Sequence, residues 1–489
     1  MRRIITLSCL IATLTFSACD NYLDIVPKGE SVLNNTSDYL GLLEDMYGYP
    51  YDSEWYLCGE ATSYNMELLK NYSAPLNATS FFWDEKFDRA STMTATGFQD
   101  FYTLCYNRIA NCNIIIQNIN DAQGSEEDKT TGVAQAKVLR AFNYFYLINT
   151  YAKPYDSQTA EQERGIILRN TFNLEEVGVQ GTVADAYRLI QQDIEESLVN
   201  LPHAPINPFR PGKSLGYALK AKVHLFKREI DEALKASLDC INEAETLGNH
   251  KLWDMNTEYS AGLKAVASMY GLPESDLEYG KPMYSMFRMS AQGYFASSYD
   301  NPEHLLFQFG MNSLSPSPSM IRKPVADLFT PSRDLRYTFS MGTMPARPTA
   351  EPGSVSLSNS MMRWNCGGIK LSEVYLMAAE CYARKSDTAN AMKYVNALRK
   401  KRIITKYYTD LTAATKEEAI KTVREERKRE LLFTNNGFFD MRRFCTEFNE
   451  TLTRAYDGKV YTLKPTSHLL TYPFPVAAIK NSNLKQNSK

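Results

Sequence analysis

The stretch AAECYARKSDTANAMKYV, residues 378–395, decides the fold, because it reads as two helices joined by a short turn. Ala379-x-x-Tyr382 lies in the first helix and Ala391 in the second, where small residues allow the two helices to pack closely. The stretch AKVHLFKREIDEA, residues 221–233, has the same spacing, with histidine in place of the tyrosine. This is the pattern of tetratricopeptide repeats, whose helix pairs stack into a scaffold. Generic helical hairpins are the alternative.

Further amphipathic helices are indicated by apolar residues that recur every three to four positions over 105–119 and 138–148. Ala141-x-x-Tyr144 in the second of these matches the first half of the repeat. Two more helix starts have the spacing of a capping box: Thr182 with Asp185, and Thr415 with Glu418. The sequence therefore predicts a mostly α protein with a tetratricopeptide-like scaffold over approximately 86–250 and 369–445.

Two regions lack this periodicity, at approximately 47–85 and 251–368, and both are irregular and rich in aromatic residues. Within the second region, LLFQF at 305–309 predicts a short strand. Because loops carried by a rigid frame usually hold function, we expect these regions to form a loop-rich ligand-binding face. Stacked repeats favour one body over residues 19–489, which ends in a C-terminal segment at 446–489.

The N-terminus indicates export. Arg2 and Arg3 precede an apolar run at 4–16, which is shorter than the roughly 20 residues that a transmembrane helix needs. Residues 1–18 are therefore predicted to be a signal peptide. Residues 16–19 resemble a bacterial lipobox, so Cys19 is the predicted lipidation site and the lipid the expected membrane anchor. An ordinary signal peptide followed by a coincidental cysteine is the alternative.

Composition narrows the function. A formal net charge of −2 provides no basic face for nucleic acid. Cysteine spacing fits neither a disulfide framework nor a zinc site, and Cys105, Cys112 and Cys381 are predicted to be buried thiols. The histidines likewise lack metal-ligand spacing: His203, His224, His250, His304 and His468. With no phosphate loop or nucleophile elbow in the sequence, we expect no metal, no cofactor and no catalytic residues.

Six short motifs lie in order along the chain: CDNYLDIVPKG at 19–29, Tyr106-x-x-Ile109-x-x-x-Asn113, AKVLRAFNY at 136–144, SEVYLMAAE at 372–380, Tyr472-Pro473-x-Pro475, and Asn483-Leu484-x-Gln486-Asn487. Together they resemble the SusD/RagB family of outer-membrane nutrient-binding lipoproteins of Bacteroidetes. One departure is that Thr434, Asn435 and Gly437 stand where that family usually has Glu, Gly and Arg. An acidic and a basic residue are absent together, a change that bears on the scaffold.

The resemblance implies a function. SusD-like proteins lie on the outer-membrane surface, bind a glycan and close over a SusC-like TonB-dependent transporter. The protein is thus predicted to be a lipid-anchored, cell-surface glycan-binding protein that delivers oligosaccharide to such a transporter. A peptide-binding protein of the RagB branch is the first alternative. A surface glycoside hydrolase and a repeat adaptor that binds only protein are the others.

Carbohydrate sites commonly combine aromatic platforms, which cover the apolar faces of sugar rings, with a few polar side chains. The four tryptophans all lie in or beside the irregular regions: Trp55, Trp83, Trp253 and Trp364. The first candidates are Trp55, Tyr56, Tyr64, Asn65 and Tyr72; further candidates are Tyr284, Tyr294, Tyr299 and Trp364, with Arg288 as a hydrogen-bond donor. Trp83, in Phe81-Phe82-Trp83, is predicted to be core. The alternative is that these aromatic residues pin loops to the scaffold.

Overall fold

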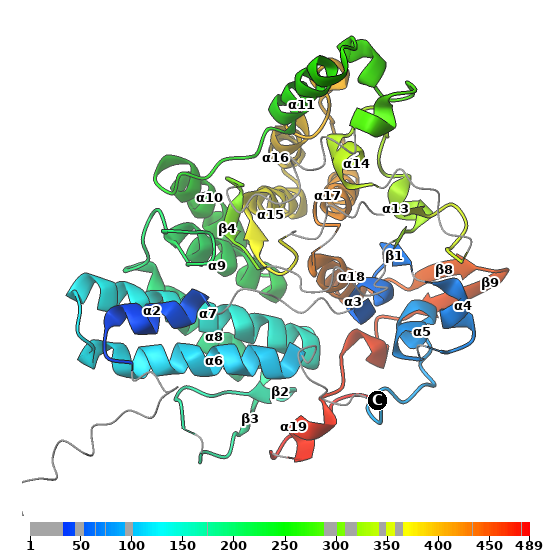
Figure 1. Ribbon diagram of the computed structural model, residues 1–489. Helices are drawn as coiled ribbons and strands as arrows, with labels where there is room; N and C mark the ends of the chain where they lie inside the picture. The colour runs from blue at the N-terminus through cyan, green and yellow to red at the C-terminus, as the bar shows by residue number, and fades with distance from the viewer. Residues whose placement is uncertain are drawn as a thin grey trace, which may run out of the picture.

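The computed structural model describes residues 33–44, 53–63, 65–73, 75–92, 101–173, 175–287, 301–308, 320–341, 349–356, 365–432, 434–480 and 482–489. Most elements are helices (Figure 1). The scaffold helices are α6 (Phe101–Asn118), α7 (Glu126–Tyr151), α8 (Val183–Leu198), α9 (Lys213–Lys227), α10 (Ile230–Thr246), α15 (Leu371–Arg384), α16 (Thr388–Lys400), α17 (Lys416–Glu430) and α18 (Asn436–Glu447). The prediction of a mostly α fold is confirmed.

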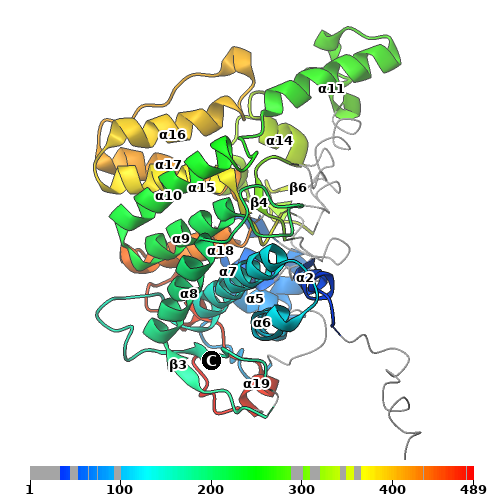
Figure 2. The same cartoon turned by 90° about the vertical axis from the view of Figure 1, so that its left-hand side faces the viewer.

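The helix pairs predicted from the alanine spacing are present. Ala221 on α9 and Ala233 on α10 are fully buried, as are Ala379 on α15 and Ala391 on α16. α9 packs against α10, α15 against α16, and α10 against α15, so the two pairs stack directly. In Figure 2 these helices lie together on one side of the molecule, with α11 (Met255–Tyr270), α14 (Leu335–Ser340) and β4 (His304–Leu306) toward the other.

Both predicted helix starts are confirmed. The Thr182 hydroxyl accepts from the Asp185 backbone N–H, and the Asp185 carboxylate accepts in return from the Thr182 N–H. Thr415 caps α17 by accepting from the Glu418 backbone N–H. Each cap satisfies a backbone donor that a helix leaves without an internal partner, which is why these residue pairs locate the boundary.

The remaining elements are short. The short helices are α2 (Thr36–Glu44), α3 (Ser53–Cys58), α4 (Met66–Lys70), α5 (Pro75–Phe82), α13 (Lys323–Ala326) and α19 (Val476–Lys480). The 3-10 turns are η3 (Ile119–Asp121), η4 (Glu274–Leu277), η6 (Thr405–Tyr407) and η7 (His468–Leu470). The remaining strands are β1 (Thr62–Ser63), β2 (Arg164–Ile167), β3 (Gln180–Thr182), β5 (Met320–Ile321), β6 (Val355–Ser356), β7 (Ile369–Lys370), β8 (Leu452–Tyr456) and β9 (Lys459–Leu463).

These strands form small antiparallel sheets of order β1-β5-β6, β2-β3, β4-β7 and β8-β9. β4 confirms a short strand close to the predicted position 305–309. β5 pairs with β1, which lies far earlier in the chain, and β6 pairs with β5. The two regions predicted to be irregular therefore pair with each other.

The region predicted to be irregular at 251–368 also contains a full helix, α11, which corrects that prediction. Asp254 caps its N-terminus by accepting from the Asn256 N–H, and Gly271 ends it with a φ of +63°. Tyr259, Leu263 and Val266 bury one face of α11 in a small separate core with Phe287 and Leu335, among others. Because this core is built from distant segments, the local pattern of small and polar residues did not indicate a helix here.

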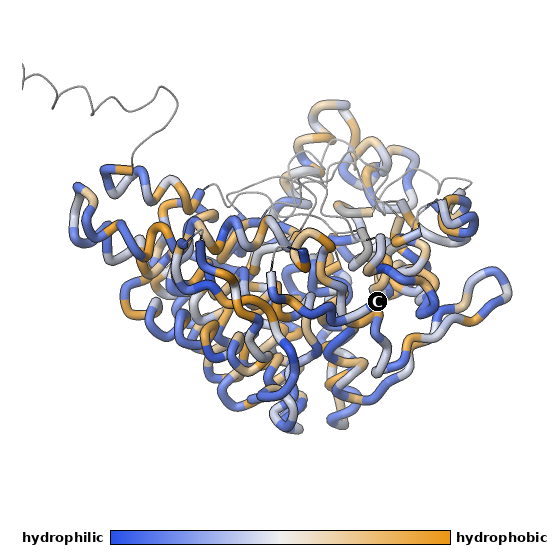
Figure 3. Tube along the Cα trace, turned by 90° about the horizontal axis from the view of Figure 1, so that it is seen from below, coloured by the Kyte–Doolittle hydropathy of each residue, from blue (hydrophilic) through white to orange (hydrophobic). Residues whose placement is uncertain are grey.

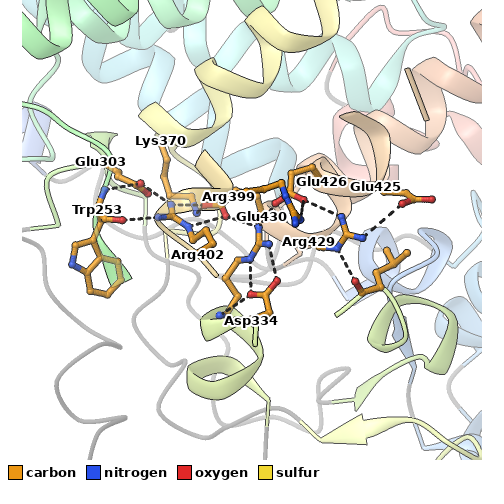
Figure 4. A network of polar contacts seen from close by, with 12 residues as sticks. Trp253, Glu303, Asp334, Lys370, Arg399, Arg402, Glu425, Glu426, Arg429 and Glu430 are labelled. Atoms are coloured by element: carbon orange, nitrogen blue, oxygen red, sulfur yellow. Dashed lines mark hydrogen bonds and ion pairs between the residues drawn. The ribbon is translucent and has the colours of Figure 1, made fainter. Parts of the chain in front are cut away.

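A network of buried ion pairs joins α17 to residues from other parts of the chain. Figure 4 shows Arg402 between Glu303 and Glu430. Arg402 Nη2 lies 2.6 Å from Glu303 Oε1 and 2.9 Å from Glu430 Oε1. Arg336 Nη1 lies 2.7 Å from Glu426 Oε1 and 3.1 Å from Glu430 Oε2. These ion pairs attach α14, the residue that precedes β4 and the loop after α16 to α17 of the repeat scaffold.

Apolar and polar residues alternate along the tube of the described chain, as amphipathic packing requires (Figure 3). Cys112 and Cys381 are fully buried and burial raises the pKa of each thiol to about 12, which confirms the prediction of buried thiols. Cys105 is fully buried as well. In the part of the chain described here, no helix combines the length and hydropathy needed to cross a membrane.

Candidate functional site: a tyrosine platform on the C-terminal hairpin

Trp55 is a core residue, so its prediction as part of a ligand platform is wrong. It is 1% exposed, and its ring lies 4.7 Å from that of Phe101 and 5.5 Å from that of Phe439. The cause is the packing of α3 against α18, which places the indole inside the main core. Trp83 is buried too, and its indole N–H donates to the Cys58 carbonyl at 2.9 Å, as expected for a core residue.

Other predicted residues have structural contacts. The Asn65 side chain caps α4 by accepting from the backbone N–H groups of Glu67 and Leu68. Tyr284 is half-buried in the small core beside α11, and its hydroxyl lies 3.3 Å from Thr338 Oγ1. Tyr284 therefore helps to hold its segment in place, as the alternative reading expected. Cys19, Tyr64, Arg288, Tyr294, Tyr299, Trp364 and the side chain of Tyr56 lie outside the described residues.

Tyr72 is the predicted candidate that the structure leaves on the surface, with 40% of it exposed. Its ring stacks on Phe82 at a centroid distance of 6.5 Å, and its hydroxyl donates to Asp84 Oδ2 at 2.9 Å. The backbone at Tyr72 has a φ of +50°, a conformation that costs a residue other than glycine about 1–3 kcal/mol. Such strain persists where the surrounding contacts fix the residue, here α4, α5 and Asp84.

Two further tyrosines lie on the same aromatic cluster and come from the hairpin β8–β9. The ring of Tyr461 lies 4.9 Å from that of Phe82, and the ring of Tyr456 lies 6.3 Å from it. Tyr456 and Tyr461 are each partly exposed. We call Tyr72, Tyr456 and Tyr461 the tyrosine platform, because all three rings contact Phe82.

The hairpin owes its geometry to its turn. Asp457 and Gly458 both have positive φ, at 52° and 72°, as a two-residue type I′ turn requires. In the resulting register Arg454 faces Tyr461 and Tyr456 faces Lys459, which sets Arg454 and both tyrosines on one face of the hairpin. The dipeptide Asp457-Gly458 between two β-prone runs is a sequence signal for this hairpin.

Arg454 anchors the hairpin to the body. Its guanidinium donates to the carbonyls of Leu57 at 3.1 Å and Gly59 at 2.7 Å, and also to that of Phe81. It lies 4.6 Å from the centroid of Phe81 and 4.3 Å from that of Trp83, which are cation–π contacts. Burial lowers the pKa of Arg454, because it disfavours the charged form of the guanidinium. The carbonyl dipoles and the ring faces stabilise this charge.

Charged groups surround the tyrosine platform. Lys70 Nζ lies 5.3 Å from the centroid of the Tyr456 ring and 3.0 Å from Asp457 Oδ2. Burial and the neighbouring Asp84 raise the pKa of Tyr72 to about 12, so its hydroxyl keeps its proton at neutral pH. The surface thus combines partly exposed aromatic rings with hydroxyl donors and carboxylate acceptors.

This arrangement suits noncovalent binding of a ligand with an apolar face and a polar edge. A sugar ring has both, since its C–H groups stack on aromatic rings while its hydroxyls donate and accept hydrogen bonds. Across the described ranges, no cluster of three or more His, Cys, Asp or Glu side chains is arranged to hold a metal ion.

Comparison with known proteins identifies the class of protein. Residues 350–488 match the model of the SusD family, and residues 21–225 match a model described as starch-binding associating with outer membrane. SusD-like protein P25 of Formosa agariphila is 24% identical over 461 residues, which cover 85% of this chain and 80% of that protein. The chain belongs to the SusD/RagB family, as its motifs indicated.

Solved structures share the fold over nearly the whole chain. A putative sugar binding protein from Bacteroides vulgatus superposes with a TM-score of 0.68 at 19% identity, covering 94% of this chain and 99% of that one. A SusD superfamily protein from Bacteroides thetaiotaomicron gives 0.68 at 16% identity, covering 93% and 100%. A laminarin binding SusD-like protein gives 0.60 at 15% identity, covering 93% and 99%.

Proposed function

We propose that this protein is a cell-surface glycan-binding lipoprotein that captures oligosaccharide on the tyrosine platform. The observation that carries the proposal is the group of three partly exposed tyrosines on Phe82, with Asp84 and Lys70 at its edge. Stacking on several rings at once suits a chain of sugar units, because each unit presents an apolar face.

The comparisons support a carbohydrate ligand and a binding role. One matching family model is described as starch-binding, and a protein of the same fold is a laminarin binding SusD-like protein. Both descriptions name binding of a glycan, and we extend a binding role to the present chain. The described residues of the platform serve only to stack and to form hydrogen bonds in this proposal.

The proposed location is the outer membrane, with the protein held by a lipid on Cys19. The description of the family model that matches residues 21–225 names association with the outer membrane, which supports this location. A protein held only by a lipid has no pore, so we further propose that it passes its ligand to a SusC-like TonB-dependent transporter. Co-purification of such a transporter from outer membranes with the tagged, full-length protein would test this step.

Peptide capture, as in the RagB branch, is the second candidate within the binding class. Tyrosines also bind peptides, since their rings cover apolar side chains and their hydroxyls bond to backbone groups. A glycoside hydrolase is another alternative, and it would need a pair of carboxylates that flank one glycosidic bond. The third alternative, an adaptor that binds only protein, predicts no response to any soluble ligand.

A mixed array of oligosaccharides and peptides distinguishes these readings. We expect the exported full-length protein to bind one or more oligosaccharides and to release no reducing ends from the parent polysaccharide. Binding restricted to peptides would move the protein to the RagB branch. Release of reducing ends would favour a hydrolase, and silence on the whole array would favour the adaptor.

A further inference from the structure

A pocket lies among α13, α17, α18 and the start of β8. It holds about 610 Å³, including the open solvent at its mouth. Its apolar lining residues include Val325, Leu432, Met441 and Leu452. The tyrosines of the platform do not contribute to this lining. We refer to it as the α17–α18 pocket.

Gly437, in the first turn of α18, leaves this pocket open. A Cβ atom built at this position would meet no other atom within 4 Å, so the backbone here borders empty space. A methyl group at 437 would therefore fit without displacing a neighbour. Glycine is also a poor helix former, so its presence in α18 lowers the stability of that helix.

One of the residues that line the pocket carries a buried donor. Arg427 lines it and is only 2% exposed, and its Nε and Nη2 donate to the two oxygens of Asp440 at 2.7 and 3.0 Å. Its remaining nitrogen, Nη1, is buried and has no hydrogen-bond partner among the described residues. A buried N–H group without an acceptor is destabilising, so a ligand that supplies an oxygen acceptor would gain from meeting it.

The charges that line the pocket are already paired. Arg427 bonds to Asp440, Lys428 lies 2.6 Å from Glu60, and Arg424 lies 2.7 Å from Glu450 outside the pocket. An anionic ligand would therefore bring an extra charge beside Asp440 and Glu60, in apolar surroundings that favour no further charge. An uncharged acceptor meets Arg427 without this penalty.

We propose that the α17–α18 pocket is a second ligand site, which binds a small uncharged molecule with an apolar body and one oxygen acceptor. The apolar side chains take the body of this molecule, and Arg427 donates to its oxygen. The site is independent of the tyrosine platform, so it stands whether or not the platform binds glycans.

The test compares three related probes by ligand-observed NMR titration of the full-length protein: phenylacetamide, phenylacetate and toluene. Phenylacetamide has the apolar body and the neutral acceptor, phenylacetate adds a charge, and toluene lacks the acceptor. We expect phenylacetamide to bind, and the other two to bind at least about tenfold more weakly.

Two substitutions at one position provide the structural control. Gly437→Trp should fill the pocket and weaken phenylacetamide binding at least about tenfold, whereas Gly437→Ala adds one methyl group and should leave it within about twofold. Thermal unfolding of both variants would verify that they fold. The proposal is overturned if phenylacetamide does not bind, if phenylacetate binds as tightly, or if folded Gly437→Trp still binds it normally.

Discussion

The anchoring role of Arg454 leads to the sharpest prediction, which concerns Arg454→Met. Methionine has an unbranched side chain like that of arginine, but it lacks the donors to the carbonyls of Leu57, Gly59 and Phe81. It also removes the cation from the faces of Phe81 and Trp83. A two-stranded hairpin is at best marginally stable alone, so β8–β9 depends on such contacts with the body.

The magnitude follows from these contacts. Each hydrogen bond from a charged donor contributes about 1.5–3 kcal/mol, and each buried carbonyl left without a donor costs about 1–3 kcal/mol. The lost desolvation cost of the guanidinium offsets part of the sum of the single bonds, so we adopt about 3–5 kcal/mol for docking of the hairpin. This corresponds to roughly 10²- to 10⁴-fold faster opening of residues 452–463.

Hydrogen exchange followed by mass spectrometry measures this opening directly. We expect amides of β8 and β9 to lose protection by that factor in Arg454→Met, while amides of α9 and α15 keep theirs. Arg454→Lys, which keeps the charge but loses the fork of donors, should fall between. If Arg454→Met accelerates exchange in the hairpin less than about fivefold, Arg454 is not the anchor.

Three further predictions concern the network, a cap and the platform. Burial alone would raise the pKa of Glu430, but Arg402, Lys370 and Arg336 lower it. The ionised Glu430 therefore stabilises the fold above about pH 4.5, and this contribution is lost as the pH falls below that value. Glu430→Gln should lower the free energy of unfolding, measured with urea, by about 3–5 kcal/mol at pH 7 and by less in acid. Thr182→Ala should cost about 1 kcal/mol in the same assay, because it removes the cap of α8; no change would argue against that cap. Since carboxylates flank the platform, oligouronates should bind more weakly than the same oligomers after carboxyl reduction. The double substitution Asp84→Asn with Asp457→Asn should reduce this difference in affinity. Equal binding of both ligands by the unsubstituted protein would contradict the prediction.

Local sequence patterns predicted the scaffold because its interactions are local. Ala221 and Ala233, like Ala379 and Ala391, lie buried on paired helices that are joined by turns of a few residues, so their spacing indicates the packing. The cap formed by Thr182 and Asp185 is likewise contained within four residues. The short strand at β4 was found from an apolar run, although its partner β7 lies more than sixty residues later.

The site was harder to predict because its parts meet from distant segments. The burial of Trp55 depends on Phe438 and Phe439 of α18, and the six residues of α3 are too few to show a periodic apolar face. Tyr72 joins Tyr456 and Tyr461 only through the fold, since nearly four hundred residues separate them. The turn at Asp457-Gly458 could have located the hairpin, but no local pattern places that hairpin against Phe82.

The most direct test of the central claim is calorimetric titration of the best oligosaccharide from the array into Tyr72→Ala, Tyr461→Ala and a matched control. Phe172→Ala serves as the control, because Phe172 is 42% exposed, close to the exposure of Tyr72, and lies outside the platform. Loss of one stacking ring should weaken binding about tenfold, which is about 1.4 kcal/mol, while the control stays within about twofold. Unchanged affinity in both tyrosine variants would contradict the account and place the glycan elsewhere on the protein.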